Sequence, residues 1–255
     1  MQVKRFEFQV APLDTLLPEG VPRNSLIGIL GETGTGKSAL LNEIAYRALK
    51  RGENVLFILL EDTPLSRVLN FESLGFEVLP YLREGRLKFI DCFSYRLAGK
   101  DIELPDELAE IHSHVEKSIV EVEDPRNEDI LWDYIERESR AIKGRGMVLL
   151  DSLTECLTIA TNPRSLLDLI KALKAVVSKY YFVPFIYTFH FGFYDEFRYA
   201  LEVASDGVID LRFNPEVIKE MLVKQMRIRR MSGSYHLANW VTFDIERGKG
   251  LVMVK

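Results

Sequence analysis

A glycine-rich segment that ends in a lysine and a hydroxyl places the strongest constraint on the fold of this chain. Residues 31–38, Gly-Glu-Thr-Gly-Thr-Gly-Lys-Ser, fit the pattern G-x-x-x-x-G-K-[ST]. The apolar run Ser25–Leu30 precedes the segment, and apolar residues at helical spacing follow it from Leu40 to Ala48. Glycines let consecutive N–H groups converge at a helix N-terminus, where negative charge is stabilised. The segment therefore predicts a polyphosphate-binding loop, whereas a purely structural glycine turn rarely has this flanking pattern.

Each residue type in this loop has an expected role toward a nucleotide. Lys37 is expected to neutralise the β and γ oxygens, and the Ser38 hydroxyl to ligate Mg²⁺. The predicted phosphate contacts are Thr33, Gly34, Thr35, Gly36, Lys37, Ser38 and Ala39.

A carboxylate that follows a second apolar run is the candidate partner of this metal. Asp151 comes directly after Met147–Leu150. It is expected to hold Mg²⁺ through Ser38 or through water. The alternative is a helix cap, which is common for an Asp that follows a strand.

Hydrolysis also needs a base that orients the attacking water. Ser152 occupies the position directly after Asp151, where many ATPases carry that base. Glu61 and Asp62 instead follow the apolar run Val55–Leu60, at the sheet edge where open α/β sheets hold ligands. We expect Glu61 to be the base and Asp62 to support it. The alternative is that both are solvated loop acids.

The order of apolar runs and helical patterns predicts an α/β fold, with a doubly wound, mostly parallel sheet that has helices on both faces. One domain over residues 1–255 is expected, with an acidic helical stretch at about 97–146, split into two helices near Pro125. Ile119 falls at helical spacing within that stretch. Antiparallel edge strands are expected near the C-terminal end. The predicted strands are Ser25–Leu30, Val55–Leu60, Leu87–Ile90, Met147–Leu150, Val183–Phe189, Gly207–Phe213, Val217–Ile228 and Tyr235–Asp244.

The composition bears on the location of the protein and its partners. A net charge of −5 disfavours nucleic acid or anionic membrane as a general partner, so any such binding needs a local basic patch. No apolar run is long enough to span a membrane, and residues 1–10 do not resemble a signal peptide. Cys92 and Cys156 fit no metal spacing and are expected to be core residues. A cytoplasmic location is expected.

Several motifs together resemble the KaiC-like branch of the RecA superfamily of ATPases. Leu13-Asp14 and Leu16-Leu17 are followed by Gly20-Val-Pro22-Arg23-Asn24-Ser25, which leads into the first strand. The phosphate loop, the pair Glu61-Asp62, where the family has paired glutamates, and Asp151-Ser152 continue the pattern. The resemblance covers most of the chain and implies a single-domain relative that binds ATP or ADP with Mg²⁺.

The resemblance also implies a homo-oligomer, often a hexameric ring, with ATP at the seams between subunits. In that family a Lys-x-Arg pair on a late strand reaches the neighbour's γ-phosphate. Arg227 matches the arginine, but Gln225 stands where lysine is expected, and Lys224 is expected to point to the opposite face unless the strand bulges. Arg229 is a second candidate. Without the resemblance, solvated edge-strand arginines are the simpler interpretation.

Two further features follow the strand Val183–Phe189. His190 is a candidate sensor of the γ-phosphate, although a structural histidine is the simpler interpretation. The segment Phe191–Arg198 corresponds to the part of RecA-type recombinases that contacts DNA, and its aromatic side chains suit base stacking. Asp195 and Glu196 outnumber Arg198, however, which favours packing of this segment in the protein over contact with DNA.

The leading hypothesis is a Mg²⁺-dependent ATPase that assembles with itself. The alternative is a non-enzymatic, nucleotide-gated scaffold or recombination and DNA-repair accessory protein with little turnover. Phosphoryl transfer to a protein hydroxyl is a third possibility, for which no acceptor stands out in the sequence.

Overall fold

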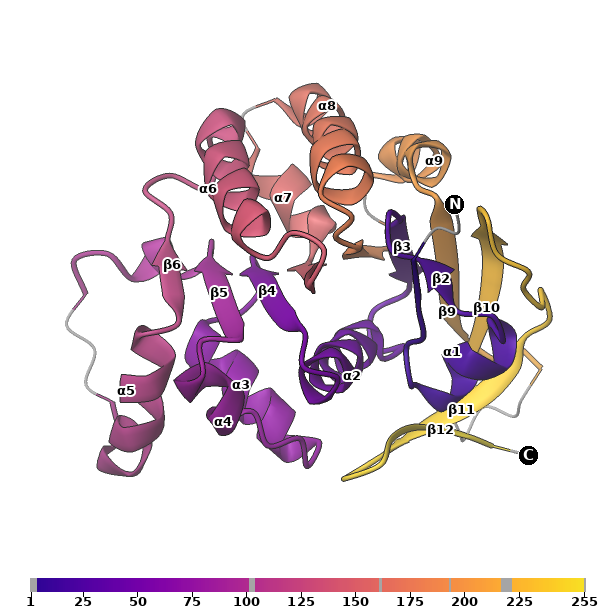
Figure 1. Ribbon diagram of the computed structural model, residues 1–255, viewed down its shortest axis with the longest axis horizontal. Coiled ribbons are helices and arrows are strands. Elements are labelled where there is room, and N and C mark those ends of the chain that lie inside the picture. Colours follow the sequence, from indigo (N-terminus) through magenta and orange to yellow (C-terminus); the bar gives the residue numbers. More distant parts are fainter. Residues whose placement is uncertain (1–3, 101–103, 161, 193, 217–221, 255) are drawn as a thin grey trace.

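A computed structural model describes residues 4–100, 104–160, 162–192, 194–216 and 222–254. Its centre is a ten-stranded sheet in the order β12-β11-β10-β9-β3-β8-β7-β4-β5-β6, which crosses the whole molecule (Figure 1). A two-stranded sheet, β1-β2, lies at its side. The strands are β1 (Arg5–Phe6), β2 (Val21–Pro22), β3 (Leu26–Gly31), β4 (Asn54–Leu59), β5 (Leu87–Asp91), β6 (Ile119–Glu121), β7 (Gly146–Asp151), β8 (Phe185–His190), β9 (Gly207–Phe213), β10 (Lys224–Met231), β11 (Val241–Glu246) and β12 (Gly250–Met253).

The sheet is parallel from β9 to β6, and β10, β11 and β12 extend it with antiparallel pairs. All residues of β3 and β7 are buried, as expected for parallel strands that are covered on both faces. The predicted doubly wound, mostly parallel sheet with antiparallel strands near the C-terminal end is therefore confirmed.

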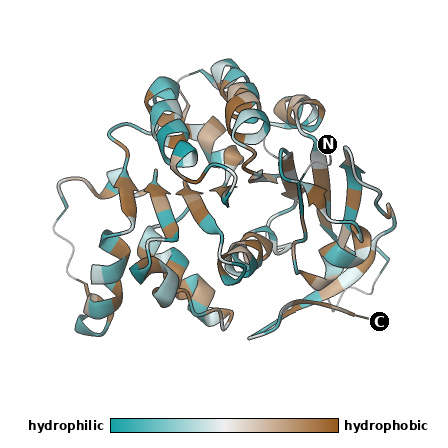
Figure 2. Ribbon diagram, in the orientation of Figure 1, coloured by the Kyte–Doolittle hydropathy of each residue, from teal (hydrophilic) through white to brown (hydrophobic). Residues whose placement is uncertain are grey.

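Helices cover both faces of the sheet (Figure 1). One buried apolar cluster packs α2 and α3 against the sheet, and a second packs α6, α7 and α8 against the other face. Apolar residues concentrate in the central strands, whereas the outer helical surfaces are more hydrophilic (Figure 2). The helices are α1 (Ala11–Leu16), α2 (Lys37–Lys50), α3 (Pro64–Ser73), α4 (Leu79–Arg83), α5 (Ala109–Glu116), α6 (Glu128–Ala141), α7 (Leu153–Ile159), α8 (Pro163–Leu173), which continues as a π-helical segment over Lys174–Tyr180, and α9 (Asp195–Ala204).

The acidic stretch contains the two expected helices, α5 and α6, on either side of Pro125. The prediction was wrong for Ile119, which begins the edge strand β6 and pairs with Phe89 of β5. An apolar residue at helical spacing also suits a short strand, and the open edge of β5 provides a hydrogen-bonding partner.

The C-terminal strands differ from the prediction in their bounds. β10 begins at Lys224 and continues past Ile228 to Met231, while 217–221 lie outside the described residues. The predicted strand over Tyr235–Asp244 is β11, which begins only at Val241. Cys92 and Cys156 are buried and free, as expected. Within the described residues, no helix is both long and apolar enough to cross a membrane.

Candidate functional site

The polar residues selected from the sequence converge on the carboxyl edge of the parallel sheet. β3, β8, β7 and β4 are neighbours in that order, and all four strands end at this edge. The phosphate loop follows β3, Glu61 follows β4, Asp151 ends β7 and His190 ends β8. Residues that are far apart in the sequence therefore meet at one place.

The loop between β3 and α2 has the backbone that its glycines predict. Gly34 and Gly36 have φ values of 85° and 97°, in the left-handed region that favours glycine. The Thr35 hydroxyl is buried and donates to the Glu32 carbonyl at 2.7 Å, which holds the turn closed. Thr33 and Gly34 are exposed, and Ser38 and Ala39 are half-buried in the first turn of α2, where N–H groups lack intrahelical partners. The loop thus presents free donors at a helix N-terminus.

Lys37 is buried against its own loop. Its Nζ donates to the carbonyl oxygens of Gly31 at 2.9 Å and Glu32 at 2.7 Å. Burial lowers the pKa of Lys37 to about 8, although the nearby carboxylates of Asp151, Glu61 and Glu32 oppose that shift. The ammonium is held in place at the base of the loop by groups that a phosphate can replace.

Asp151 lies at the centre of a buried polar network. One oxygen, Oδ2, accepts from Arg67 Nη2 at 2.7 Å, and the other, Oδ1, accepts from Thr188 Oγ1 at 2.6 Å. The side chain of Ser38 lies close enough to this carboxylate to help lower its pKa. Burial alone would raise the pKa of Asp151, but the charge and hydrogen bonds of Arg67 and the hydroxyl of Thr188 lower it below its usual value. Asp151 therefore stays an anion beside the serine of the phosphate loop.

Glu61 faces the same centre from β4. Its Oε1 accepts a hydrogen bond from Ser152 Oγ and lies 3.1 Å from His190 Nε2. His190 Nδ1 is 3.5 Å from the Thr33 hydroxyl, so the imidazole bridges Glu61 and the phosphate loop. About a third of the Glu61 side chain is exposed, which leaves it accessible to water.

Asp62 is directed elsewhere. Its Oδ1 accepts from the Thr63 N–H at 2.9 Å, and its Oδ2 accepts from Asn70 Nδ2 at 3.0 Å. Asp62 thus stabilises the start of α3, so its contacts support the segment that carries Glu61 and do not reach the other site residues.

The arginines of β10 are paired within the chain. Arg227 Nε lies 2.8 Å from Asp210 Oδ2, and its guanidinium stacks on Trp240 at 4.6 Å from the ring centroid. Arg229 also pairs with Asp210, at 2.8 Å, and with Glu202, at 2.6 Å.

Gln225, at the position where the family carries lysine, is hydrogen-bonded within the chain. Gln225 Oε1 accepts from Arg212 Nε at 3.1 Å. A Cβ added at Gly36 would lie 3.9 Å from Lys224 Cδ, so Lys224 is on the face of α2, beside the chain's own phosphate loop. The β-bulge lies between Ile228 and Arg230, past this point. Lys224 is therefore on the opposite face from Arg227, as expected.

The aromatic segment after β8 joins the protein's own packing. Phe191, Tyr194 and Phe197 contact the apolar cluster under α8 and α9, and Arg198 stacks on the Phe191 ring at 5.2 Å. Phe193 lies outside the described residues. These contacts agree with packing of the segment in the protein, which was the favoured interpretation.

The donor set at the carboxyl edge suits a hard cation that brings most of its own ligands. Ser38 and Asp151 offer oxygen donors side by side. The described residues contain no cluster of three or more His, Cys, Asp or Glu side chains that would enclose a metal. Mg²⁺ keeps several waters and uses few protein ligands beside phosphates, so these residues fit it.

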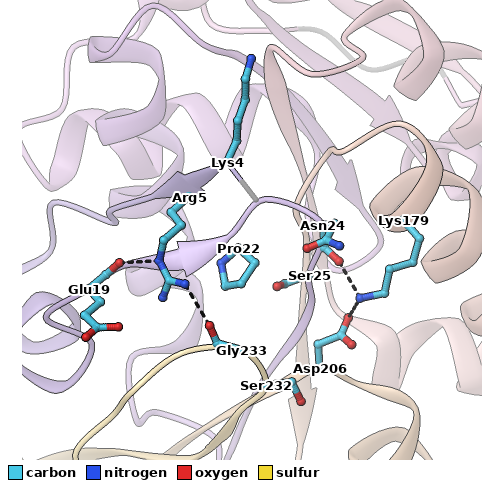
Figure 3. Close-up of a pocket in the computed structure, with 10 residues that line it drawn as sticks. All are labelled: Lys4, Arg5, Glu19, Pro22, Asn24, Ser25, Lys179, Asp206, Ser232 and Gly233. Carbon is cyan, nitrogen blue, oxygen red and sulfur yellow. Dashed lines mark hydrogen bonds and ion pairs between the residues drawn. The ribbon is translucent and has the colours of Figure 1, made fainter. Parts of the chain in front are cut away.

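A large hollow lies at the opposite, amino edge of the sheet. This cavity of about 1080 Å³ is lined by residues that include Arg5, Asn24, Lys179 and Asp206 (Figure 3). Lys179 Nζ donates to the Asn24 carbonyl at 2.7 Å and to Asp206 at 2.8 Å, and Arg5 donates to the carbonyls of Glu19 and Gly233. These cations are already paired, and the cavity is separate from the residues that converge at the carboxyl edge.

Sequence reasoning did not select several residues of the site. Arg67 and Thr188 hold Asp151, Ser152 contacts Glu61, and Trp240 contacts Arg227. The only available signal was position: Thr188 and Ser152 lie at strand ends beside selected residues, and Arg67 is one turn after Thr63. Ser152 belongs to the pair Asp151-Ser152 but was given no contact in the site, and the other three belong to no motif.

The fold and the loop define a P-loop protein of the α/β class, in which a glycine-rich turn joins the central strand to a helix. The model of the KaiC ATPase family matches residues 7–255, so the chain belongs to that family.

Individual relatives match over most of their length. The chain is 26% identical to a UPF0273 protein of Thermotoga maritima, over 98% of this chain and 96% of that one. It is 27% identical to a UPF0273 protein of Pyrobaculum aerophilum, over 92% and 79% of the two chains. The crystal structure of a KaiC-like protein of Pyrococcus horikoshii matches with a TM-score of 0.76 at 21% identity, over the whole of both chains, and shares the fold.

Proposed function

We propose that the protein binds ATP at the carboxyl edge of the sheet and hydrolyses it with Mg²⁺. One observation carries the proposal: Lys37, Ser38, Asp151 and Glu61 come from three separate strand ends and lie within one network of hydrogen bonds and close charges. Family membership supports nucleotide binding by this loop.

Different residues of the chain bind the phosphates and the metal. The N–H groups of the loop and the first turn of α2 receive the phosphates, and Lys37 exchanges its carbonyl partners for phosphate oxygens. Ser38 and Asp151 are the proposed holders of Mg²⁺, which supplies positive charge to the β and γ oxygens.

Glu61 is the proposed base. It has the exposure that a water molecule needs, and its hydrogen bonds to Ser152 and His190 fix its orientation. A carboxylate in this position accepts a hydrogen bond from water and directs the oxygen lone pair at the γ-phosphorus.

Assembly of several copies is part of the proposal. Arg227, with Arg229 beside it, is the candidate group that reaches the nucleotide of a neighbouring chain. Head-to-tail contacts of this kind form a ring when the rotation between neighbours closes, and the proposal is such a ring.

The alternative is a nucleotide-gated scaffold with slow turnover, and two observations favour it. Gln225 replaces the family lysine and is already bonded to Arg212, and Arg227 is paired with Asp210 of its own chain.

Substitution of Glu61 by Gln separates the two functions. The Glu61→Gln variant is expected to bind ATP as wild type does and to lose ~10²–10⁴-fold in steady-state phosphate release, because the amide accepts a proton poorly. Unchanged phosphate release in Glu61→Gln would remove Glu61 from this role. Tight ATP binding by wild type without measurable release would favour the scaffold.

A further inference from the structure

Arg67 is a buried cation that no motif accounts for. Its side chain is 3% exposed and lies on α3, over the Phe57 ring at 4.9 Å. Nη1 donates to Asn42 Oδ1 at 3.2 Å, and Nη2 donates to Asp151 Oδ2 at 2.7 Å. Within the described part of the chain, Asp151 is the only carboxylate paired with it.

The burial of both charges makes the pair rigid. A buried guanidinium without a counter-charge is costly, so Arg67 keeps its place only while Asp151 faces it. Thr188 holds the other carboxylate oxygen at 2.6 Å. With both oxygens engaged from opposite sides, the carboxylate cannot rotate without breaking a buried hydrogen bond.

Arg67 also connects Asp151 to the segment that carries Glu61. α3 begins at Pro64, and the Arg67 N–H donates to the Thr63 carbonyl at 2.9 Å, so Arg67 closes the first turn after Glu61, Asp62 and Thr63. Glu61 in turn contacts Ser152, the neighbour of Asp151. Two contacts, Arg67 with Asp151 and Glu61 with Ser152, therefore join the segment after β4 to the end of β7.

We propose that Arg67 is a positioning residue of the nucleotide site, which fixes the Asp151 carboxylate toward Ser38 and so sets how strongly Mg²⁺ strengthens nucleotide binding. The inference rests on the proposed function, because it needs Mg²⁺ at Ser38 and Asp151. Residues that orient a metal ligand from behind typically change metal affinity ~10–100-fold when they are removed.

The test compares two buried arginines. Arg67→Met removes the charge and keeps much of the apolar stem. Arg23→Met is the matched control, because Arg23 is also buried, pairs with Glu53 at 2.6 Å, donates to the Gly146 carbonyl and lies over an aromatic ring. Arg23 is at the amino edge of the sheet, away from the loop. Titration with a fluorescent ATP analogue, in excess Mg²⁺ and in EDTA, gives for each variant the factor by which Mg²⁺ strengthens binding.

Arg67→Met is expected to lose at least ~10-fold of this Mg²⁺ factor while its affinity in EDTA stays within about threefold of wild type. Arg23→Met is expected to keep the wild-type factor even if its melting temperature falls. Arg67→Lys retains the charge but lacks the planar fork that places Nη1 at Asn42 and Nη2 at Asp151, and is expected to lose about threefold.

A folded Arg67→Met with the wild-type factor would overturn the inference, and so would an equal loss in Arg23→Met. If Arg67→Met does not fold, Arg67→Lys decides: an unchanged factor overturns the inference and a reduced one supports it. Wild type without any Mg²⁺ factor would contradict the proposed function itself, and with it this inference.

Discussion

Arg227→Ala tests whether one chain completes the nucleotide site of another. In the isolated chain Arg227 is held by Asp210 and by the Trp240 ring, with about a third of its side chain exposed. Breaking a partly exposed ion pair costs ~0.5–1 kcal/mol, and losing the contact with the half-buried Trp240 ring costs a similar amount. Asp210 is not left unpaired, because Arg229 contacts both of its oxygens. Release of Arg227 therefore costs about 1–2 kcal/mol in total.

If Arg227 acts as proposed, the gain at a neighbour's phosphate is larger than this cost. An arginine that stabilises the transition state contributes ~10³–10⁵ in rate, or about 4–7 kcal/mol. Arg227→Ala is therefore expected to lower steady-state phosphate release by at least ~100-fold while ATP binding persists. Arg212→Ala is the control, because Arg212 also stacks on the Trp240 ring, at 3.8 Å from the ring centroid, but donates to Gln225 and not to Asp210. It is expected to change release by less than about threefold.

A mixing assay shows whether the arginine acts between chains. Lys37→Ala removes the lysine of the loop, and Arg227→Ala removes the arginine. In an equal mixture, about a quarter of head-to-tail seams join an intact loop to an intact arginine. Phosphate release is then expected to recover to about a quarter of wild type. A mixture no more active than its separate components would refute action in trans.

Three further outcomes follow from the structure. Gly250→Ala is expected to lower the free energy of unfolding in urea by at least ~3 kcal/mol, because the new Cβ would lie 2.3 Å from the buried Glu43 carboxylate. The control Gly248→Ala is also at positive φ but has open space around it, so it should lower this free energy by only ~1–2 kcal/mol. Equal losses in the two variants would contradict this reasoning. Because the pKa of Lys37 is about 8 and a bound phosphate would raise it, ATP binding should weaken as pH rises through 8, and binding near and above pH 8 should take up protons, as measured by calorimetry in buffers of different ionisation enthalpy. Affinity independent of pH from 7 to 9 would argue against this. Burial raises the pKa of Asp206, but the Leu26 N–H and two lysines outweigh burial, so the pKa lies below its usual value of 3.8. Asp206→Asn should therefore lower the free energy of unfolding by ~1–3 kcal/mol at pH 7 and by progressively less below pH 4. A difference that stays constant across this range would exclude the charge as the cause.

The sequence predicts the parallel core well because its strands are buried on both faces and therefore consist of short apolar runs. β3, β4, β7 and β8 all lie where such runs occur. The sheet edges are harder to predict. β6 has only three residues, and its strand conformation depends on the pairing that β5 offers. A local pattern contains no information about that partner.

The same division applies to the site. Lys37, Ser38, Asp151 and Glu61 could be selected from the sequence because the chemistry expected of them depends on position after a strand. The role of Arg67 depends on a contact between residues far apart in the sequence: 84 residues separate it from Asp151, and only the packing of α3 against the sheet brings them together. Pairing of Arg227 with Asp210 could not be predicted for the same reason, since it arises from the register of β9 and β10.

The ammonium of Lys37 donates to two main-chain oxygens of its own loop, those of Gly31 and Glu32. In the proposed function, a triphosphate therefore has to compete with these two main-chain oxygens for the protons of the ammonium. The binding affinity then reflects the replacement of two carbonyl partners by phosphate oxygens. This replacement favours the most highly charged phosphate chain over a less charged anion such as a single sulfate.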